Sequence, residues 1–395
     1  VKKLLERLWA ACRSRMVGNP ATITSNWYRE RTMDAEKPPD GHPGGTPRGR
    51  DSGHPSGTSP DESGGHPGDK PSGTEGHPGG SPMARDFSKT PLIVTWEVTQ
   101  ACGLECDHCR AEAKPDRHPE ELTTEEGKRL LEDVASFGHP PPILVFSGGD
   151  PLERPDLDEL VDYASELGLP TAVTPAPTEN LTREVVQRFD EAGIHRMALS
   201  LDGSDADSHD EFRGESGSYE RVQRAAEWAE ETGLAIQINT TVTANTVESL
   251  PEIADQVAEL GAVMWEVFFL VPIGRGTELE QLTPTQADEW MAWLYRRQRE
   301  APFRVITVEA PQYRRIAREV EGEPVSVGST RAGSGFVFIS HRGDVYPSGF
   351  LPQSAGNVRE DDLVTLYRDA PLFERLRDPD QFSGRCGNCP YRDLC

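Results

Sequence analysis

The sequence has no run of eighteen consecutive apolar residues, so a transmembrane helix is not expected. Residues 1–17 place basic side chains around a short apolar core, which is too interrupted for a secretory signal. We therefore expect a cytoplasmic protein without a membrane partner.

Lysine is scarce, at 7 of the 41 basic residues, and acidic residues outnumber basic ones by 66 to 41. The resulting net charge of −25 repels the phosphate backbone, which argues against a nucleic-acid partner. A large acidic excess with little lysine suits high salt, where screening removes most self-repulsion. The composition therefore predicts a halophilic source.

Cysteine is also rare, and six of the seven cysteines fall in two groups. This usage argues against a disulfide framework and suits a reducing compartment. Residues 38–82 contain no aliphatic or aromatic residue and repeat Gly-His-Pro, which predicts disorder. We expect residues 1–82 to be a disordered extension and Met83 to be the natural start.

A regular alternation of strand and helix patterns begins near residue 92. Amphipathic helical patterns separate the strands, and Thr123 and Glu126 form a predicted capping box. The alternation predicts an α/β fold, an open partial (β/α)6 TIM-type barrel over residues 83–324. The six predicted strands are 93–98, 143–146, 170–174, 197–201, 235–241 and 264–271, and the pattern predicts a further strand at 304–308.

The pattern changes after residue 322. Residues 335–340 and 343–346 flank a turn and predict a hairpin. The chain then ends in a C-x2-C-x5-C run that contains Cys386, Cys389 and Cys395. We interpret residues 325–395 as a small cysteine-rich module.

The first group of cysteines has the spacing C-x3-C-x2-C and directly follows the first strand. Cys102, Cys106 and Cys109 could hold a soft metal or an iron–sulfur cluster. Three thiolates leave one iron of a [4Fe–4S] cube without a protein ligand, and an open position is typical of a catalytic metal. Zinc is the alternative, but His108 lies between two of the cysteines and would point poorly as a fourth ligand.

Two further motifs follow later strands. Ser147-Gly148-Gly149-Asp150-Pro151 has paired glycines that let backbone carbonyls approach a ligand closely. Ser200 and Asp202 follow the fourth strand, and Arg213 has the planar guanidinium that suits a carboxylate. The structural alternatives are a strand-to-helix turn for the first motif and a turn with a surface ion pair for the second.

Together these motifs resemble those of the radical SAM superfamily. The resemblance implies that Cys102, Cys106 and Cys109 bind the cluster whose open iron takes S-adenosylmethionine, and that one electron converts this cofactor into a 5′-deoxyadenosyl radical that abstracts hydrogen from a substrate. It also implies that His108 lies near the adenine. An electron donor such as ferredoxin or flavodoxin would act as partner.

The resemblance also assigns roles to the later motifs. Gly148, Gly149 and Asp150 would hold the methionyl ammonium, Ser200 and Asp202 would lie by the ribose and methionyl parts, and Arg213 would pair with the methionyl carboxylate. Together with His108, these residues form the binding site for S-adenosylmethionine that the resemblance implies.

The carboxyl-terminal cysteines resemble the start of the auxiliary-cluster motif of the SPASM-type members. Cys386, Cys389 and Cys395 would then hold an auxiliary iron–sulfur cluster, with a zinc knuckle as the alternative. This sequence departs from the motif because Ser348 stands where cysteine is usual.

The likeness extends to peptide maturases of the pyrroloquinoline-quinone and mycofactocin kind and to haem-pathway enzymes. The substrate would therefore be a ribosomal peptide or a tetrapyrrole, and the cysteine module favours the peptide slightly. A non-catalytic electron carrier or a zinc scaffold is the alternative of another class. Glu97, in a Trp-Glu-Val-Thr run, could touch cofactor or substrate or be purely structural, and Arg275 is a candidate substrate contact.

Overall fold

A twisted sheet of mainly parallel strands forms the centre of the molecule. The computed structural model describes residues 85–322 and 330–394, so the predicted extension 1–82 and Cys395 lie outside the described residues. In the first strand, Val94 and Trp96 are fully buried on the face that the helices cover, while Thr95 is half-buried on the opposite face. This alternation is what a strand needs to separate a packed face from a barrel interior.

Eight strands run parallel, in the order β9-β1-β2-β3-β4-β5-β6-β7, and β10 and β11 continue the sheet beyond β9 in antiparallel pairing. Within the described residues β7 and β11 are the two ends of this path, so the barrel is open, as predicted. The strands are β1 (Ile93–Glu97), β2 (Ile143–Ser147), β3 (Thr171–Val173), β4 (Arg196–Ser200), β5 (Ile236–Val242), β6 (Met264–Phe269), β7 (Arg304–Val308), β8 (Arg331–Ala332), β9 (Gly335–Ile339), β10 (Asp344–Tyr346) and β11 (Gly356–Asn357).

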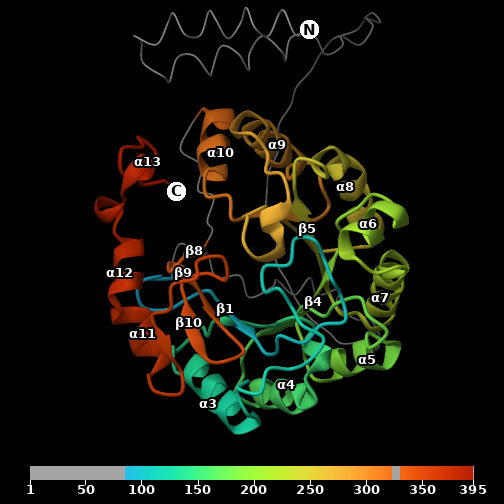
Figure 1. Cartoon of the computed structure of the whole chain (residues 1–395), viewed down its shortest axis with the longest axis vertical. Coiled ribbons are helices and arrows are strands. Elements are labelled where there is room, and N and C mark those ends of the chain that lie inside the picture. The colour runs from blue at the N-terminus through green and yellow to red at the C-terminus, as the bar shows by residue number, and fades with distance from the viewer. Residues whose placement is uncertain (1–84, 323–329, 395) are drawn as a thin grey trace, which may run out of the picture. The chain divides into compact units, whose positions relative to one another are not determined.

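Helices surround the strands in an arc (Figure 1). The predicted capping box of Thr123 with Glu126 is confirmed at the start of α3, and a second box, of Thr283 with Gln286, begins α9. The helices are α3 (Thr124–Ala135), α4 (Leu157–Glu166), α5 (Arg183–Glu191), α6 (Ala206–Arg213), α7 (Ser218–Thr232), α8 (Leu250–Glu259), α9 (Pro284–Arg297), α10 (Tyr313–Glu321), α11 (Leu363–Asp369), α12 (Pro371–Arg377) and α13 (Gly384–Gly387).

Helix α6 was not predicted, because its sequence lacks an apolar stripe. Its buried residues are His209, Phe212 and Arg213, two of which are polar. The helix begins at an Asp205 cap and ends at Gly214, whose φ of +67° suits glycine.

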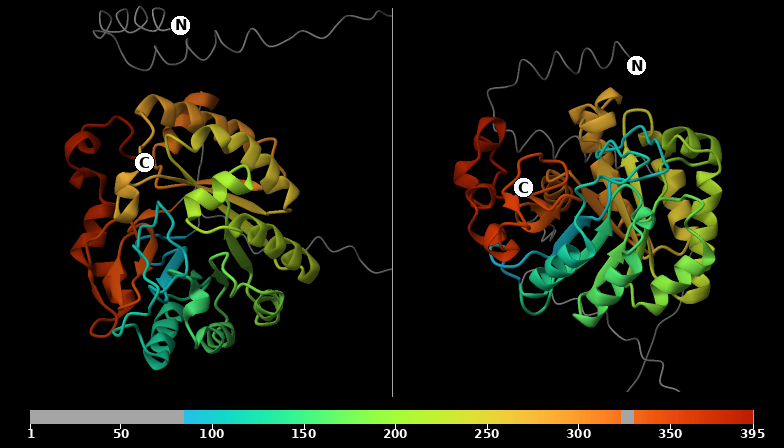
Figure 2. Two further views of the ribbon diagram at one scale, coloured as in Figure 1. Left: turned by 45° about the vertical axis from the view of Figure 1, so that its right-hand side comes forward. Right: turned by 60° about the horizontal axis from the view of Figure 1, so that its bottom comes forward.

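The predicted hairpin is confirmed as β9 and β10, but it is not a separate sheet. β9 pairs with β1 in parallel, with Ile93 opposite Phe336. Helix α11 contacts α3, and α11–α13 lie beside the hairpin at one side of the barrel (Figure 2). This pairing joins segments about 240 residues apart and brings the β9–β10 turn to the carboxyl ends of the parallel strands, where active sites of such folds form.

None of the helices in residues 85–322 and 330–394 has the length and apolar character needed to cross a bilayer.

Candidate functional site

The first cysteine group lies on a loop that leaves the carboxyl end of β1. Cys102 and Cys106 are buried, with 9% and 7% exposed surface, and Cys109 is partly buried. All three are free thiols, and apolar side chains such as Leu104 pack beside them. The loop is closed at its base, where the Cys102 N–H donates to the Lys114 carbonyl at 2.8 Å. The three sulfur donors therefore sit on one closed loop.

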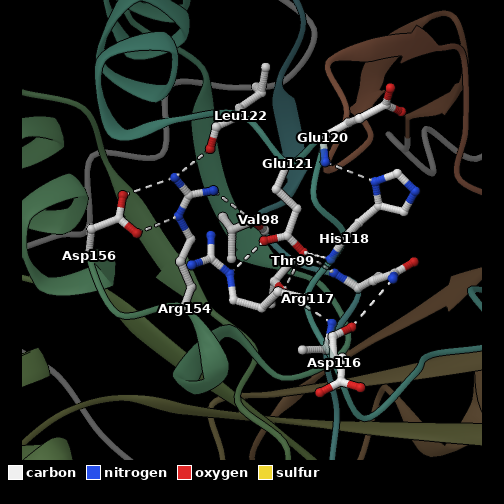
Figure 3. A network of polar contacts seen from close by, with 12 residues as sticks. Val98, Thr99, Asp116, Arg117, His118, Glu120, Glu121, Leu122, Arg154 and Asp156 are labelled. Carbon is white, nitrogen blue, oxygen red and sulfur yellow. Dashed lines mark hydrogen bonds and ion pairs between the residues drawn. The ribbon is translucent and has the colours of Figure 1, made fainter.

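A buried polar network fixes the base of this loop, as Figure 3 shows. One carboxylate oxygen of Glu121 accepts from the Thr99 hydroxyl at 2.7 Å and from the Gln100 N–H at 3.0 Å. The other oxygen accepts from Arg117 at 2.7 Å. The carboxylate therefore organises the residues that immediately precede Cys102.

Arg154 supports the same junction from the other side (Figure 3). Its side chain is fully buried and donates to the carbonyls of Val98 and Leu122, each at 2.8 Å. It also forms an ion pair with Asp156 at 2.9 Å. Neither Glu121 nor Arg154 belongs to a local motif that predicts this role, so sequence reasoning missed both residues.

The end of α6 packs against the middle of the cysteine loop. The His108 ring stacks on Phe212 at 4.7 Å between centroids and 9° between planes. Arg213 Nη1 donates to the Cys106 sulfur at 3.4 Å, and Arg213 Nε lies 3.1 Å from Asp202 Oδ2. The structure thus brings together four residues that the sequence analysis selected, namely Cys106, His108, Asp202 and Arg213.

Several polar atoms around this group are buried without a hydrogen-bond partner in the described residues. They include His108 Nδ1, Asp202 Oδ2 and Arg213 Nε, because the Asp202–Arg213 ion pair lacks the geometry of a hydrogen bond. Buried polar atoms are costly unless something satisfies them. Their presence beside three thiols fits a site that binds a polar ligand next to a soft metal centre.

Burial and local charge set the titration of these groups. Burial lowers the pKa of His108 to about 4 and raises the pKa of Cys102 to about 12. Burial acts to raise the pKa of Asp202, but the positive charge of Arg213 and the hydrogen bond from the Thr241 N–H outweigh it, and the pKa is lowered. The site therefore holds a neutral imidazole next to an ionised carboxylate.

The glycine-rich turn after β2 packs directly on the cysteine loop. A Cβ atom on Gly149 would lie 2.2 Å from the Ala101 carbonyl oxygen, so only glycine fits there. The Asp150 carboxylate accepts from the Leu152 and Ala176 N–H groups and from the Thr178 hydroxyl at 2.9 Å. Burial raises the pKa of Asp150 to about 6. Protein donors thus occupy this carboxylate, and it links the turns after β2 and β3.

Ser200 and Asp202 follow the carboxyl end of β4. Ser200 is half-buried and pairs in register with Asn239 of β5. Asp202 Oδ1 accepts from the Thr241 N–H at 2.6 Å, and the other carboxylate oxygen, Oδ2, faces Arg213. The two residues therefore share an edge of the sheet with the cysteine loop.

Arg275, the candidate substrate contact, lies against the cysteine loop. It lies in the short 3-10 helix η4 (Gly274–Glu278), and its Nε donates to the Cys106 carbonyl at 2.8 Å. Its own N–H donates to the Cys109 carbonyl at 3.1 Å. Because these hydrogen bonds end on two carbonyls of the cysteine loop, Arg275 braces that loop.

The second cysteine group is at the surface. Cys386 is exposed and Cys389 is partly buried, and the Cys389 N–H donates to the Cys386 carbonyl at 3.1 Å. Ser348, which stands where the auxiliary-cluster motif usually has a cysteine, donates a hydrogen bond to Glu309 at 3.0 Å. Among the described residues no set of three or more His, Cys, Asp or Glu side chains is gathered closely enough to hold a single metal ion.

Three comparisons place the chain among known proteins. The family model "Radical SAM superfamily" matches residues 96–262. An AdoMet-dependent heme synthase of Methanosarcina barkeri is 38% identical over 78% of this chain and 91% of its own length. A mycofactocin maturase of Mycobacterium tuberculosis is 31% identical over 77% of both chains.

Among solved structures, Streptococcus suis SuiB bound to S-adenosylmethionine has a similar fold. Its TM-score is 0.64 at 21% identity, covering 78% of this chain and 72% of SuiB. The arrangement of strands and helices therefore recurs in SuiB.

Proposed function

Since this chain belongs to the radical SAM superfamily, a family of enzymes that use a [4Fe–4S] cluster and S-adenosylmethionine, we propose that it removes hydrogen from an iron tetrapyrrole of haem biosynthesis. The observation that carries the choice of substrate is the 38% identity with a heme synthase across 91% of that protein. The mycofactocin maturase is less similar, at 31%.

In this proposal Cys102, Cys106 and Cys109 bind the cluster. Bound together, the cluster and S-adenosylmethionine supply a 5′-deoxyadenosyl radical. The chain's part is to hold both in a buried site and to exclude water from it. The closed loop, braced by Arg275 and by the Glu121 network, keeps the three sulfurs in place.

The polar atoms next to the loop would bind S-adenosylmethionine. Arg213 Nε and Asp202 Oδ2 form an ion pair with each other but make no hydrogen bond, and their chemistry matches a carboxylate and an ammonium or hydroxyl. The stacked ring of His108 lies in the same group, where it can face a planar base. Ser200 and the main chain at Gly148 and Gly149 complete the expected contacts.

The remaining parts of the proposal concern electron supply. A ferredoxin or flavodoxin would deliver the first electron. Cys386, Cys389 and Cys395 would hold an auxiliary cluster that accepts the electron left on the substrate. A peptide substrate is the second candidate, and it rests on the similarity to the mycofactocin maturase.

The test is anaerobic reconstitution with iron and sulfide, followed by reaction with S-adenosylmethionine and dithionite. We expect 5′-deoxyadenosine release to increase when iron coproporphyrin III is added, together with a mass change of the porphyrin. A short peptide encoded by a neighbouring gene is the matched alternative substrate. Stimulation by the peptide alone would reject the tetrapyrrole assignment, and a colourless zinc protein would reject the cluster.

A further inference from the structure

A carboxylate–histidine pair lies at the carboxyl edge of the sheet, where the cysteine loop leaves β1. Glu97 is the last residue of β1, and His341 follows β9, the parallel neighbour of β1. His341 Nδ1 and Glu97 Oε1 are 2.6 Å apart. The sequence analysis considered Glu97 as a substrate contact but did not select His341, because only the long-range pairing of β9 with β1 brings it there.

The second oxygen of Glu97 fixes the carboxylate. Arg110, the residue after Cys109, donates to Glu97 Oε2 at 2.5 Å, and its guanidinium lies 4.6 Å from the centre of the Phe338 ring. Burial acts to raise the pKa of Glu97, but the hydrogen bond from His341 and the charge of Arg110 outweigh it, and the pKa is lowered. An ionised carboxylate can only accept, so Nδ1 of His341 carries the proton that it donates to Glu97.

Hydrogen bonds of the main chain also fix the position of His341. The Leu122 N–H donates to the His341 carbonyl at 2.8 Å. The turn that follows is closed by Ser340, whose hydroxyl accepts from the N–H groups of Arg342 and Asp344. The ring of His118, oriented by the Glu120 N–H (Figure 3), lies 5.4 Å from the His341 ring.

One ring nitrogen of His341 has no hydrogen-bond partner among the described residues. Nε2 has no hydrogen bond to any residue that the structure describes, and it is not buried, since the side chain keeps 15% of its surface exposed. A histidine that binds a metal commonly donates its other N–H to a carboxylate, which fixes the tautomer and raises the basicity of the free nitrogen. The arrangement of Glu97 and His341 has this form.

We propose that His341 Nε2, oriented by Glu97, binds the iron of the tetrapyrrole substrate and so positions the macrocycle at the mouth of the barrel. This inference rests on the proposed function, because it presupposes an iron tetrapyrrole. An imidazole is a common ligand of haem iron. One axial bond, placed beside the cysteine loop, restrains the macrocycle relative to the site where the radical forms.

The experiment measures binding to the anaerobic holoenzyme without S-adenosylmethionine. Coproporphyrin III with and without ferric iron is titrated into wild type, His341→Ala, His341→Gln and Glu97→Gln, and difference absorbance and electron paramagnetic resonance spectra report the iron ligand. We expect wild type to bind the iron form with the spectrum of imidazole ligation. Both His341 variants lose that spectrum and the preference for iron, and added imidazole restores the spectrum to His341→Ala.

Glu97→Gln should weaken binding of the iron form by about 10- to 100-fold while keeping the ligation spectrum. Binding of the metal-free porphyrin should be equal in wild type and all variants, which shows that each variant is folded. His195→Ala is the matched control, since His195 is exposed and precedes the amino end of β4, and it should behave as wild type.

Two results overturn the inference alone. In the first, wild type and His341→Ala bind iron coproporphyrin with the same spectrum and the same affinity. This result overturns the inference even if the variant forms no product, because His341 would then act as a base and not as an iron ligand. In the other, His118→Ala abolishes the ligation spectrum and His341→Ala does not. If wild type binds neither porphyrin, the proposed function fails and the inference fails with it.

Discussion

Cys102 and Cys106 are buried under the ends of β1, β2 and α6, whereas Cys386 is exposed on a helix of four residues. The first group is braced by side chains from distant segments, among them Arg213 and Arg275. In the second group the polar contacts are mostly local or exposed, such as the pair of Arg392 with Asp380, whose side chains are 35% and 83% exposed.

The two cysteine groups therefore differ in how strongly the surrounding structure restrains them. A buried, braced loop keeps its geometry when chemistry occurs next to it, because its hydrogen bonds are shielded from water. A surface segment tolerates change more easily. We therefore expect substitutions in the two regions to have very different effects, even when the residue types match.

The largest difference is expected for the cysteines themselves. Cys106→Ala should abolish 5′-deoxyadenosine formation, because it removes one of only three protein ligands of the proposed cluster. Cys386→Ala should lower the iron content of the reconstituted protein but retain cleavage of S-adenosylmethionine. Iron analysis and product chromatography of both variants provide the measurement. Equal cleavage by wild type and Cys106→Ala would reject the ligand assignment.

Matched arginines test the bracing network. Arg154→Met leaves two buried carbonyls and Asp156 without their donor, and it should lower the free energy of unfolding by about 3–5 kcal/mol. Arg392→Met breaks an exposed ion pair and should cost about 0–1 kcal/mol. Anaerobic urea unfolding of both variants measures the difference. Similar losses in the two variants would mean that Arg154 does not support the loop as described.

Matched glycines test the backbone. Gly149→Ala places a methyl group 2.2 Å from the Ala101 carbonyl oxygen, which must move, at a cost of about 1–3 kcal/mol and with reduced cleavage of S-adenosylmethionine. Gly384→Ala meets nothing within 4 Å, so it carries only the strain of a φ near +60°, about 1 kcal/mol, and should leave cleavage unchanged. Thermal unfolding and the cleavage assay, run on both variants, separate the two effects. Unchanged cleavage in Gly149→Ala would argue against tight packing of the two loops.

The sequence predicted the barrel well because its strands and helices are encoded locally. The strands are short runs rich in apolar and β-branched residues, and helices such as α3 and α9 begin with capping boxes that need only four residues, at Thr123 and Thr283. The cysteine spacing and the Gly148-Gly149 pair are likewise local. Such features can be read from a single sequence because the interacting residues are neighbours in the chain.

Residues that act across long distances could not be predicted in the same way. Glu121 and Arg154 resemble ordinary surface residues until folding buries them, and Arg275 contacts a loop about 170 residues earlier. Helix α6 was missed because it buries His209 and Arg213, so its pattern does not look apolar. His341 stands in a correctly predicted turn, but its meeting with Glu97 follows from the pairing of β9 with β1.

The smallest expected effect concerns the ion pair that joins the barrel to the loop after β11. Arg359 donates to Glu126 at 2.9 Å and to the Arg342 carbonyl in the turn that carries His341. The hydrogen bond from Arg359, with those at the α3 cap, lowers the pKa of Glu126 to about 2 from its usual value of 4.5. A lowered carboxyl pKa stabilises the folded state fully above the unfolded value, and this contribution is lost as the pH falls toward 2.

Glu126→Gln should therefore be less stable than wild type by about 1 kcal/mol at pH 7, since the pair is partly exposed and screened. The difference should shrink steadily below pH 4.5 and vanish near pH 2, and 1 M salt should reduce it at pH 7. Unfolding curves of the two proteins across this pH range provide the measurement. A difference that does not change with pH would assign the effect to the helix cap, whose hydrogen bonds glutamine retains in part, and would remove the ion pair from the forces that hold the His341 turn against the barrel.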